Sequence, residues 1–480
     1  MISITGSIPI IQTFIIRINE YSWVRRIKQK IKGGNQVTDQ NNRRKFLKMG
    51  SIAMIAGASS GIPLIGHASI KNLRSDVALL PRAKGPRVVV VGAGTAGLTI
   101  AKYLKLENPK FDVVVVEKRD MYSSCFSSNL WYDDLINLEF LAGYSFLDAA
   151  KNNNYIFFNA TCTGLDRSAR KVYTNQGYID YEFLVLTPGI DYDYSRIGIT
   201  DVDTEFALRT TCPGGFAMPT EHVTIRNKVR NFKGGIFIQT VPSGNYRCLP
   251  APYERACMIA AYFKKHKIKG KVLILDFSPE ITIKAQGFHA AFEELYKDYI
   301  EWQPSVNITG VDVDRKSIKT EFDSIPFDEA SIYPGVRASK MIEWFDLVDP
   351  RSPQKEANID PFRYHVIGDP HVYVAGDSRP MGFSKSATTS NTEGKHVAKV
   401  LAATEKGQQI DWASPQTVCY SMVNGDPMEA IAVYANYIYD EHKRAFTSSP
   451  ETKLFQKRDK EKGLAALSWA EGIYQDLFRN

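Results

Sequence analysis

The chain lacks the features that mark several classes of protein. Its six cysteines include no CxxC pair and no CxxCH motif, so the chain does not bind c-type haem covalently and has no evident zinc knuckle. With 44% hydrophobic and 23% charged residues, the composition excludes a disordered, collagenous or many-helix membrane protein. A length of 480 residues allows two to four globular domains.

Net charge is absent from most of the chain. The formal charge is +8, but residues 1–68 contain ten Lys/Arg and two Asp/Glu and so account for the whole surplus. The remaining residues carry no net charge, and we therefore expect no nucleic-acid partner.

The basic N-terminal segment is typical of an export signal. Arg43-Arg44 and Phe46-Leu47 precede a diluted apolar stretch, Met49 to Gly66, and small residues follow at Gly66-His67-Ala68. The stretch is too short and too diluted for a membrane span. We interpret residues 1–68 as a twin-arginine-type leader, which predicts a periplasmic protein that acquires a cofactor before export. A basic loop before a buried helix is the alternative. The apolar run at residues 2–16 is either an extra anchor or sequence upstream of a later start.

A dinucleotide-binding fingerprint follows the leader. A β-branched strand, residues 87–91, leads into Gly92-Ala93-Gly94-Thr95-Ala96-Gly97 and a helical pattern, and a second strand ends on Glu117. The first two glycines permit a tight turn and close approach of a pyrophosphate, the third permits helix–strand packing, and the acidic residue accepts ribose hydroxyls. The residues expected at this cofactor site are Gly92, Gly94, Ala96, Gly97, Glu117 and Lys118.

Two later segments select FAD as the dinucleotide. One strand runs into Thr187-Pro188-Gly189, and another, beginning at His371, ends in Gly376-Asp377. These segments resemble the later signatures of flavoproteins with two dinucleotide-type domains, in which this Asp binds the ribityl chain of the flavin.

A second strand–helix–strand unit is predicted from about Gly234 to Asp276. Its connecting loop, residues 241–252, has prolines and bulky residues where a nicotinamide site needs glycines. The sequence therefore argues against NAD(P)H as the reductant.

The same loop contains the candidate catalytic residues. Cys248 lies between Arg247 and Arg255 near the start of the predicted helix, where positive charge would lower the pKa of its thiol. Glu254 is close enough in sequence to serve as a proton acceptor. A buried cysteine and a capping glutamate in a stiff loop are the alternative interpretation.

From about Pro86 to its C-terminus, the chain resembles the flavoprotein subunit of flavocytochrome c sulfide dehydrogenase, a relative of sulfide:quinone oxidoreductases. The matching segments are Ser124–Asn129, Tyr246–Arg255, Ile300-Glu301-Trp302, Gly376-Asp377 and Cys419-Tyr420-Ser421. The resemblance implies an α/β fold with two interleaved Rossmann-like dinucleotide-binding-type domains and a C-terminal α+β domain. Its expected boundaries are residues 86–200 and 340–400 for the FAD domain, 201–339 for the second domain and 401–480 for the last.

The resemblance also implies a cofactor linkage, a reaction and a partner. Cys125 would hold FAD covalently through a thioether, and a separate c-type cytochrome subunit would accept electrons singly. The substrate would be sulfide or another small reduced sulfur compound, with Cys248 as nucleophile or sulfur carrier and Glu254 as proton acceptor. Lys385 would place positive charge near the flavin, or else lie solvated in a loop.

One departure from the family affects this interpretation. The family has a redox disulfide between the cysteine at Cys248 and a second cysteine, whose position here is Ala357. Cys212 and Cys257 are the candidate substitutes. Two other functions therefore stay open: a quinone-linked relative, and a flavin electron-transfer or assembly partner without sulfide turnover.

Overall fold

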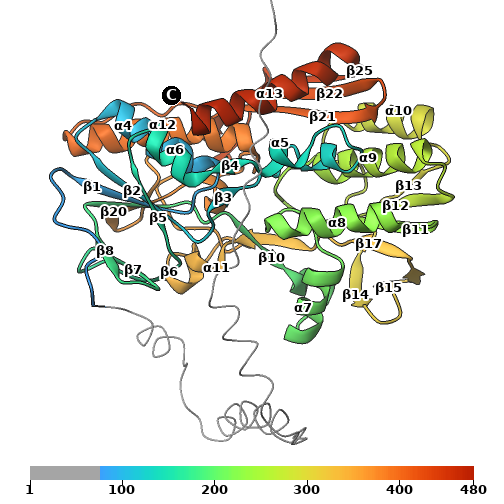
Figure 1. Ribbon diagram of the computed structural model, residues 1–480, viewed down its shortest axis with the longest axis horizontal. Coiled ribbons are helices and arrows are strands. Elements are labelled where there is room, and N and C mark those ends of the chain that lie inside the picture. Colours follow the sequence, from blue (N-terminus) through green and yellow to red (C-terminus); the bar gives the residue numbers. More distant parts are fainter. Residues whose placement is uncertain (1–75, 480) are drawn as a thin grey trace, which may run out of the picture. The chain divides into compact units, whose positions relative to one another are not determined.

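The computed structural model describes residues 76–479, which include both predicted Rossmann-like regions and the C-terminal region (Figure 1). The predicted export leader lies outside the described residues.

The first layer is a mainly parallel six-stranded sheet built from two distant parts of the chain. Its strands, in spatial order, are β19 (His365–Val366), β20 (Asp369–Val374), β9 (Phe183–Leu186), β1 (Arg87–Val91), β2 (Asp112–Glu117) and β5 (Ile156–Asn159). Only the β19–β20 pair is antiparallel within this sheet. Strand β1 is buried along its whole length, which explains its unbroken run of valines.

Helices α4 (Thr95–Glu107) and α12 (Ala387–Glu405) pack against each other beside this sheet (Figure 1). The turn from β1 into α4 needs its glycines. Gly92 has φ +100°, and a Cβ there would lie 2.5 Å from the Thr187 carbonyl oxygen, while a Cβ at Gly97 would overlap the Gly92 carbonyl oxygen. The predicted close packing of helix on strand is therefore present.

A second, fully parallel sheet lies in the middle of the sequence. Its order is β13 (Ile300–Gln303), β12 (Gly270–Asp276), β11 (Gly235–Val241) and β17 (Glu329–Ser331). Helix α9 (Ala251–Lys265) connects β11 to β12 and is buried over most of its length. These two sheets confirm the predicted α/β class with a parallel-sheet core.

The C-terminal region forms an antiparallel sheet of β21 (Thr417–Gly425), β22 (Met428–Ala435) and β25 (Lys453–Asp459). Helix α13 (Lys460–Phe478) packs on β22, and β21 packs on α9 of the central region. This last contact brings the C-terminal sheet to the start of α9, where the candidate catalytic residues lie.

Shorter elements complete the described part of the chain. The helices are η1 (Ser128–Trp131), α5 (Leu138–Ala142), α6 (Phe146–Asn152), η2 (Tyr194–Ile197), α7 (Val202–Thr211), α8 (Pro219–Asn231), α10 (Ala285–Leu295), α11 (Lys340–Trp344) and η3 (Gly376–Ser378). The strands are β3 (Met121–Tyr122), β4 (Tyr144–Ser145), β6 (Cys162–Asp166), β7 (Lys171–Thr174), β8 (Tyr178–Asp180), β10 (Ile190–Asp193), β14 (Ile308–Asp312), β15 (Ser317–Thr320), β16 (Ser324–Pro326), β18 (Gly335–Ala338), β23 (Tyr437–Asp440) and β24 (Ala445–Ser448).

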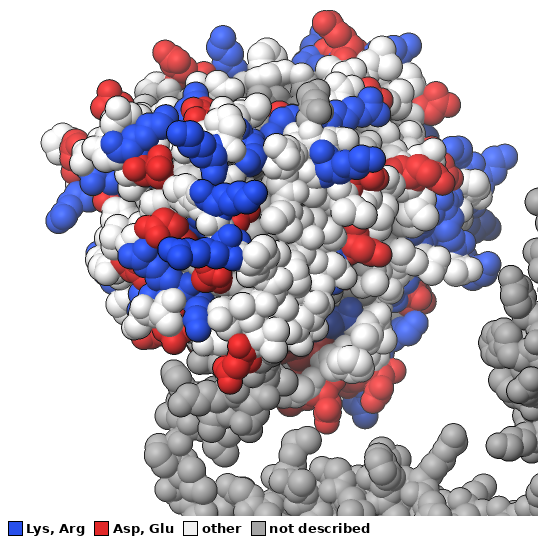
Figure 2. Space-filling view, turned by 60° about the vertical axis from the view of Figure 1, so that its left-hand side comes forward, with Lys and Arg blue, Asp and Glu red and all other residues white. Residues whose placement is uncertain are grey.

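The surface carries charges of both signs, as expected for the part of the chain that has no net charge. Lys/Arg and Asp/Glu side chains intermingle over the face shown in Figure 2, and its central area is largely uncharged. Among residues 76–479, no helix is long and apolar enough to cross a membrane.

Candidate functional site

The main cleft runs along the carboxyl ends of the strands in the first sheet. It encloses about 1470 Å³, including space open to solvent. Every residue predicted to contact the cofactor lines it except Gly97, which packs α4 against the turn after β1. The predicted residues along its wall are Gly92, Gly94, Ala96, Glu117, Lys118, Cys125, Thr187, Pro188, Gly189, Gly376, Asp377 and Lys385. Binding at this edge is the general behaviour of open α/β sheets.

One end of the cleft is shaped for a dinucleotide. A Cβ at Gly94, which caps α4, would meet no atom within 4 Å, so space is left where a pyrophosphate would meet the helix N-terminus. Glu117 accepts from the Ala93 N–H at 3.0 Å and from Arg119 Nε at 2.8 Å. Burial opposes its ionisation, but the hydrogen bonds from Arg119 and Ala93 hold the pKa of Glu117 below its usual value. An ionised acceptor for ribose hydroxyls is therefore in place.

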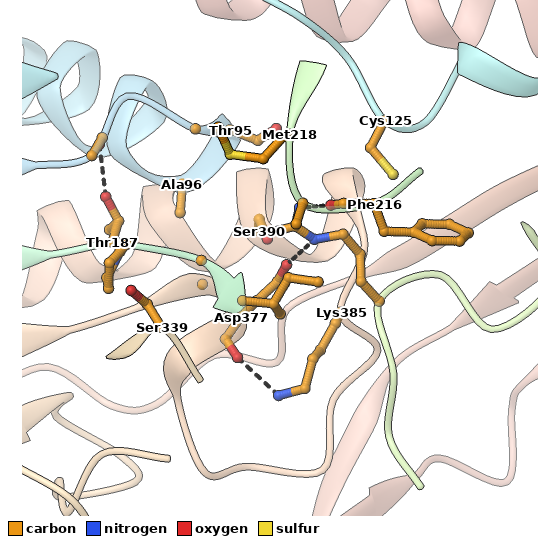
Figure 3. Close-up of a pocket in the computed structure, with 18 of the residues that line it drawn as sticks. Thr95, Ala96, Cys125, Thr187, Phe216, Met218, Ser339, Asp377, Lys385 and Ser390 are labelled. Carbon is orange, nitrogen blue, oxygen red and sulfur yellow. Dashed lines mark hydrogen bonds and ion pairs between the residues drawn. The ribbon is translucent and has the colours of Figure 1, made fainter. Parts of the chain in front are cut away.

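Asp377 lies in the middle of the cleft wall (Figure 3). Its Oδ2 accepts from Arg247 Nε at 2.6 Å, whereas its buried Oδ1 has no partner among the described residues. A buried carboxylate oxygen without a partner is costly unless a ligand supplies a hydrogen-bond donor. The open space at Gly94 and this unpaired oxygen together fit FAD, to which Asp377 would offer a hydrogen-bond acceptor.

Lys385 is buried, with 0% of its surface exposed, so the alternative of a solvated lysine is wrong. Its Nζ donates to Glu356 Oε1 at 2.6 Å and to the Asp377 carbonyl oxygen at 2.9 Å. Burial lowers the pKa of Lys385, although Glu356 partly offsets this effect. Since Glu356 neutralises the ammonium, Lys385 serves mainly to fix the Gly376-Asp377 turn.

Cys125 lies on the loop after β3, and its sulfur points toward Phe216 in the cleft (Figure 3). It is half-buried and free, and its carbonyl oxygen accepts from Ser128 Oγ at 2.8 Å. Burial raises the pKa of the Cys125 thiol to about 11, with Arg247 acting in the opposite direction. The segment that resembles the family motif therefore has its thiol on the wall of the cleft.

Cys248 also lines the cleft and has φ +91°, a strained value for a side-chain-bearing residue. The prediction that its pKa is lowered is wrong. A hydrogen bond to Cys419, followed by burial, raises the pKa of the Cys248 thiol well above 9. The two arginines do not supply the expected charge, because Arg247 pairs with Asp377 and Arg255 bonds to Asn129, Gly214 and Ser331.

Glu254 lies in the first turn of α9 and does not line the cleft. Its Oε1 accepts from the Met422 N–H at 2.7 Å and its Oε2 from Asn129 Nδ2 at 2.8 Å. It therefore binds the C-terminal strand β21 rather than capping its own helix. Burial raises the pKa of Glu254 to about 7, so this carboxyl can hold or release a proton near neutral pH.

Neither of the two predicted substitutes for the missing second cysteine lines the cleft. Cys212 is buried at the end of α7, beside Thr211, and Cys257 is fully buried within α9. The thiol within hydrogen-bonding reach of Cys248 is instead that of Cys419, on β21. Lys284 lies beside Cys419, and its Nζ donates to Ser421 Oγ at 2.7 Å and to the Cys419 carbonyl oxygen at 3.4 Å. No sequence pattern around Lys284 indicates a role for this residue.

Comparison with protein families identifies the central and C-terminal regions. Residues 223–334 match the central region of the sulfide dehydrogenase (flavocytochrome c) flavoprotein chain. Residues 411–478 match the flavin-binding region of flavocytochrome c sulphide dehydrogenase, and residues 90–140 match the NAD(P)-binding Rossmann-like domain. The expected family resemblance is thus confirmed.

Individual relatives cover most of the described chain. A type II NADH:quinone oxidoreductase of Staphylococcus haemolyticus is 34% identical over 69% of this chain and 87% of its own. The mitochondrial sulfide:quinone oxidoreductase of Dictyostelium discoideum is 23% identical over 64% of this chain and 68% of its own. The sulfide:quinone oxidoreductase structure from Aquifex aeolicus shares the fold, with a TM-score of 0.68, 14% identity and coverage of 82% of this chain and 92% of its own. The chain belongs to the FAD-dependent flavoprotein oxidoreductases that include these quinone reductases, and within them it is similar to the flavocytochrome c sulfide dehydrogenase flavoprotein.

Proposed function

We propose that this flavoprotein oxidises sulfide, or another small reduced sulfur compound, and passes the electrons singly to a c-type cytochrome. The observation that carries the proposal is the presence of two thiols, Cys125 and Cys248, on the wall of one FAD-shaped cleft. An enzyme for an organic hydride donor needs no thiol at this place, whereas sulfur chemistry uses one as nucleophile or sulfur carrier.

The chain's own residues divide the work of this reaction. Bound FAD would supply two-electron acceptance and one-electron release. Arg247 holds Asp377 in the orientation that leaves Oδ1 free for the cofactor, and Lys385 fixes the same turn from behind. Cys248 lines the cleft. Glu254, in the first turn of α9, would hold or release the proton that accompanies the chemistry of this thiol.

Covalent attachment of FAD through Cys125 forms part of the proposal. The thiol lies on the wall of the cleft, in the segment that resembles the family motif. Export to the periplasm, supported by the paired arginines of residues 1–68, would place the protein where c-type cytochromes and reduced sulfur compounds meet. N-terminal sequencing of the mature protein tests the export step.

NADH oxidation is the competing function, favoured by the relative of 34% identity. The structure of the second parallel sheet opposes it. Strand β1 is joined to α4 by residues 92–94 alone, whereas β11 is joined to α9 by residues 242–250, which include two prolines. The tight glycine turn that admits a pyrophosphate is therefore missing at the second sheet.

The test is an anaerobic titration of the holoprotein that follows the flavin spectrum. We expect sulfide to bleach the flavin and NADH to leave it oxidised, and a soluble c-type cytochrome to restore the colour one electron at a time. Bleaching by NADH would establish the competing function, and reoxidation by a short-chain quinone but not by cytochrome would establish a quinone-linked enzyme. A flavin that neither donor reduces would indicate an electron-transfer or assembly partner.

A further inference from the structure

One part of the cleft wall is a segment with neither helix nor strand structure. This wall segment, residues 214–218, lies between α7 and α8. Its members that line the cleft are Phe216, Ala217 and Met218. Figure 3 shows Phe216 on the same side as Cys125, away from Thr187 at the dinucleotide end, with Asp377 between the two groups. The flavin ring of a bound FAD would therefore meet the wall segment at Phe216.

Two buried side chains, Glu221 on α8 and Tyr192 on β10, accept the N–H groups of the wall segment. The Glu221 carboxylate accepts those of Gly215, Phe216 and Met218, and the Tyr192 hydroxyl oxygen accepts those of Phe216 and Ala217. The Tyr192 O–H in turn donates to Glu221 Oε2 at 2.5 Å. The bond from Met218 is the usual one of a glutamate in the first turn of a helix, whereas the other bonds reach back into the wall segment.

Two arginines hold the carbonyl groups of the wall segment. Arg255 Nη1 donates to the Gly214 carbonyl oxygen at 2.5 Å, and Arg247 Nη1 donates to the Phe216 carbonyl oxygen at the same distance. Since Arg247 also donates to Asp377, one guanidinium joins the wall segment to the cofactor turn.

The wall segment is thus fixed by side chains from other elements. Gly215 has φ +77°, and a Cβ there would lie 2.7 Å from Arg255 Nη2, so a larger residue would displace the arginine. The ring of Phe216 stacks on Tyr333 with centroids 4.0 Å apart, and the Arg255 guanidinium lies 4.4 Å from its centroid. A surface that is fixed before its ligand arrives loses less conformational entropy on binding.

We propose that Glu221 is a positioning residue that fixes the wall segment against the flavin ring of FAD. Glu221 does not line the cleft and acts through the N–H groups that it accepts. The inference goes beyond the proposed function, because it concerns the cofactor alone and holds for any electron donor. A flavin that sulfide leaves oxidised would reject sulfide oxidation and keep the role of Glu221.

The release of FAD from the holoprotein tests this role. Glu221→Gln replaces one acceptor oxygen by an NH₂ group, so the N–H groups on that side of the residue lose their acceptor. In a Cys125→Ala background we expect FAD to dissociate roughly 10- to 100-fold faster when Glu221 is also replaced. Flavin fluorescence after dilution follows the release. Glu301→Gln, which changes an exposed carboxylate on the second sheet, is the matched control and should release FAD as the background does. An unchanged rate in Glu221→Gln would overturn the proposal.

A second control separates positioning from a general loss of stability. Ile318→Val removes a buried methylene from β15, which does not line the cleft, and should lower stability without changing the release of FAD. Equal acceleration in Ile318→Val and Glu221→Gln would overturn the proposal.

The visible circular dichroism of the bound flavin gives a readout with Cys125 intact. Glu221→Gln should alter the visible bands, because the wall beside the flavin ring has moved, while the far-ultraviolet spectrum stays that of the parent. Tyr192→Phe removes the oxygen that accepts from Phe216 and Ala217, and it should alter the same bands. Visible bands identical to those of the parent in both variants would show that the wall segment does not position the flavin.

Discussion

Arg247 Nε donates to Asp377 Oδ2 at 2.6 Å, which ties the loop before α9 to the turn after β20 and so joins the two parallel sheets across the cleft. Arg247 also donates to the Phe216 carbonyl oxygen at 2.5 Å. Burial opposes the charge of Arg247, but Asp377 and Cys125 raise its pKa above the usual value. The residue next to Cys248 is thus committed to positioning the cofactor turn.

Replacement of the Asp377 carboxylate should weaken flavin binding. Asp377→Asn removes the negative charge that pairs with Arg247. It also replaces one carboxylate oxygen by an amide NH₂ group, so that an uncharged amide would face the ribityl hydroxyl. A hydrogen bond to a charged group contributes about 1.5–3 kcal/mol, so we expect roughly 10- to 150-fold weaker retention of FAD. The flavin absorbance per protein, measured in a Cys125→Ala background to exclude covalent retention, reports the effect. Asp312→Asn, on β14, should retain the parent's flavin. Full flavin content in Asp377→Asn would refute the assignment.

The thioether at Cys125 has a simple chemical test. In the parent, acid precipitation should leave the yellow flavin colour in the pellet. In Cys125→Ala the colour should move to the supernatant, although the native variant should still bind FAD. Cys162→Ala should keep the colour in the pellet. Colour in the supernatant of the parent would show that FAD is held without a covalent bond.

The proton-acceptor role of Glu254 predicts a pH-dependent rate. Because burial raises the pKa of Glu254 to about 7, the carboxylate form increases as pH rises through neutrality. At a fixed concentration of hydrosulfide, flavin reduction in the parent should accelerate across this range. Glu254→Gln should be roughly 100-fold slower above pH 7 and independent of pH there. Stopped-flow absorbance measures both, and an unchanged profile in the variant would assign the proton to another group.

The same carboxyl makes the folded state less stable as pH rises. Between its ordinary pKa of 4.5 and about 7, folded Glu254 holds a proton that the unfolded chain has released, so stability is lost as pH increases through this window. The full contribution is about 3 kcal/mol by the size of the pKa change. Urea unfolding at about pH 5 and about pH 8 should show this loss in the parent and a smaller one in Glu254→Gln. Equal losses in both proteins would place the titration elsewhere.

The cofactor cradle could be predicted because its determinants are local. The turn from β1 to α4 depends on glycines within a few residues of each other, and Glu117 ends the neighbouring strand, so the sequence pattern contains the geometry. The Gly376-Asp377 turn was predictable for the same reason, since strand, turn and acidic residue are consecutive.

The chemistry around Cys248 could not be predicted in this way. The nearby arginines suggested a thiolate at Cys248, but each guanidinium is directed to another acceptor by residues far away in the sequence. The packing of β21 on α9 brings Cys419 to the site, and the hydrogen bond to Ser421 brings Lys284 there as well. No local sequence pattern predicts a contact between segments so far apart in the chain. The absence of a cysteine at Ala357 left the neighbour of Cys248 open, and the packing of β21 on α9 shows that the nearby thiol is Cys419.

Lys284 offers the sharpest test of how the site keeps Cys419 ionised. The removal of its ammonium in Lys284→Met leaves a side chain of similar length but takes away the only lysine whose charge lowers the pKa of Cys419 in the described chain. We expect the pKa of Cys419 to rise from about 6, so that less thiolate is present at neutral pH. The thiolate ultraviolet absorbance of the reduced protein, taken as a difference from Cys419→Ser at each pH, follows this titration. Lys271→Met, which breaks an exposed ion pair with Glu301 on the second sheet, should leave the curve in place. An unshifted curve in Lys284→Met would mean that the hydrogen bond from Cys248 alone sustains the thiolate, and Cys248→Ala would then abolish it.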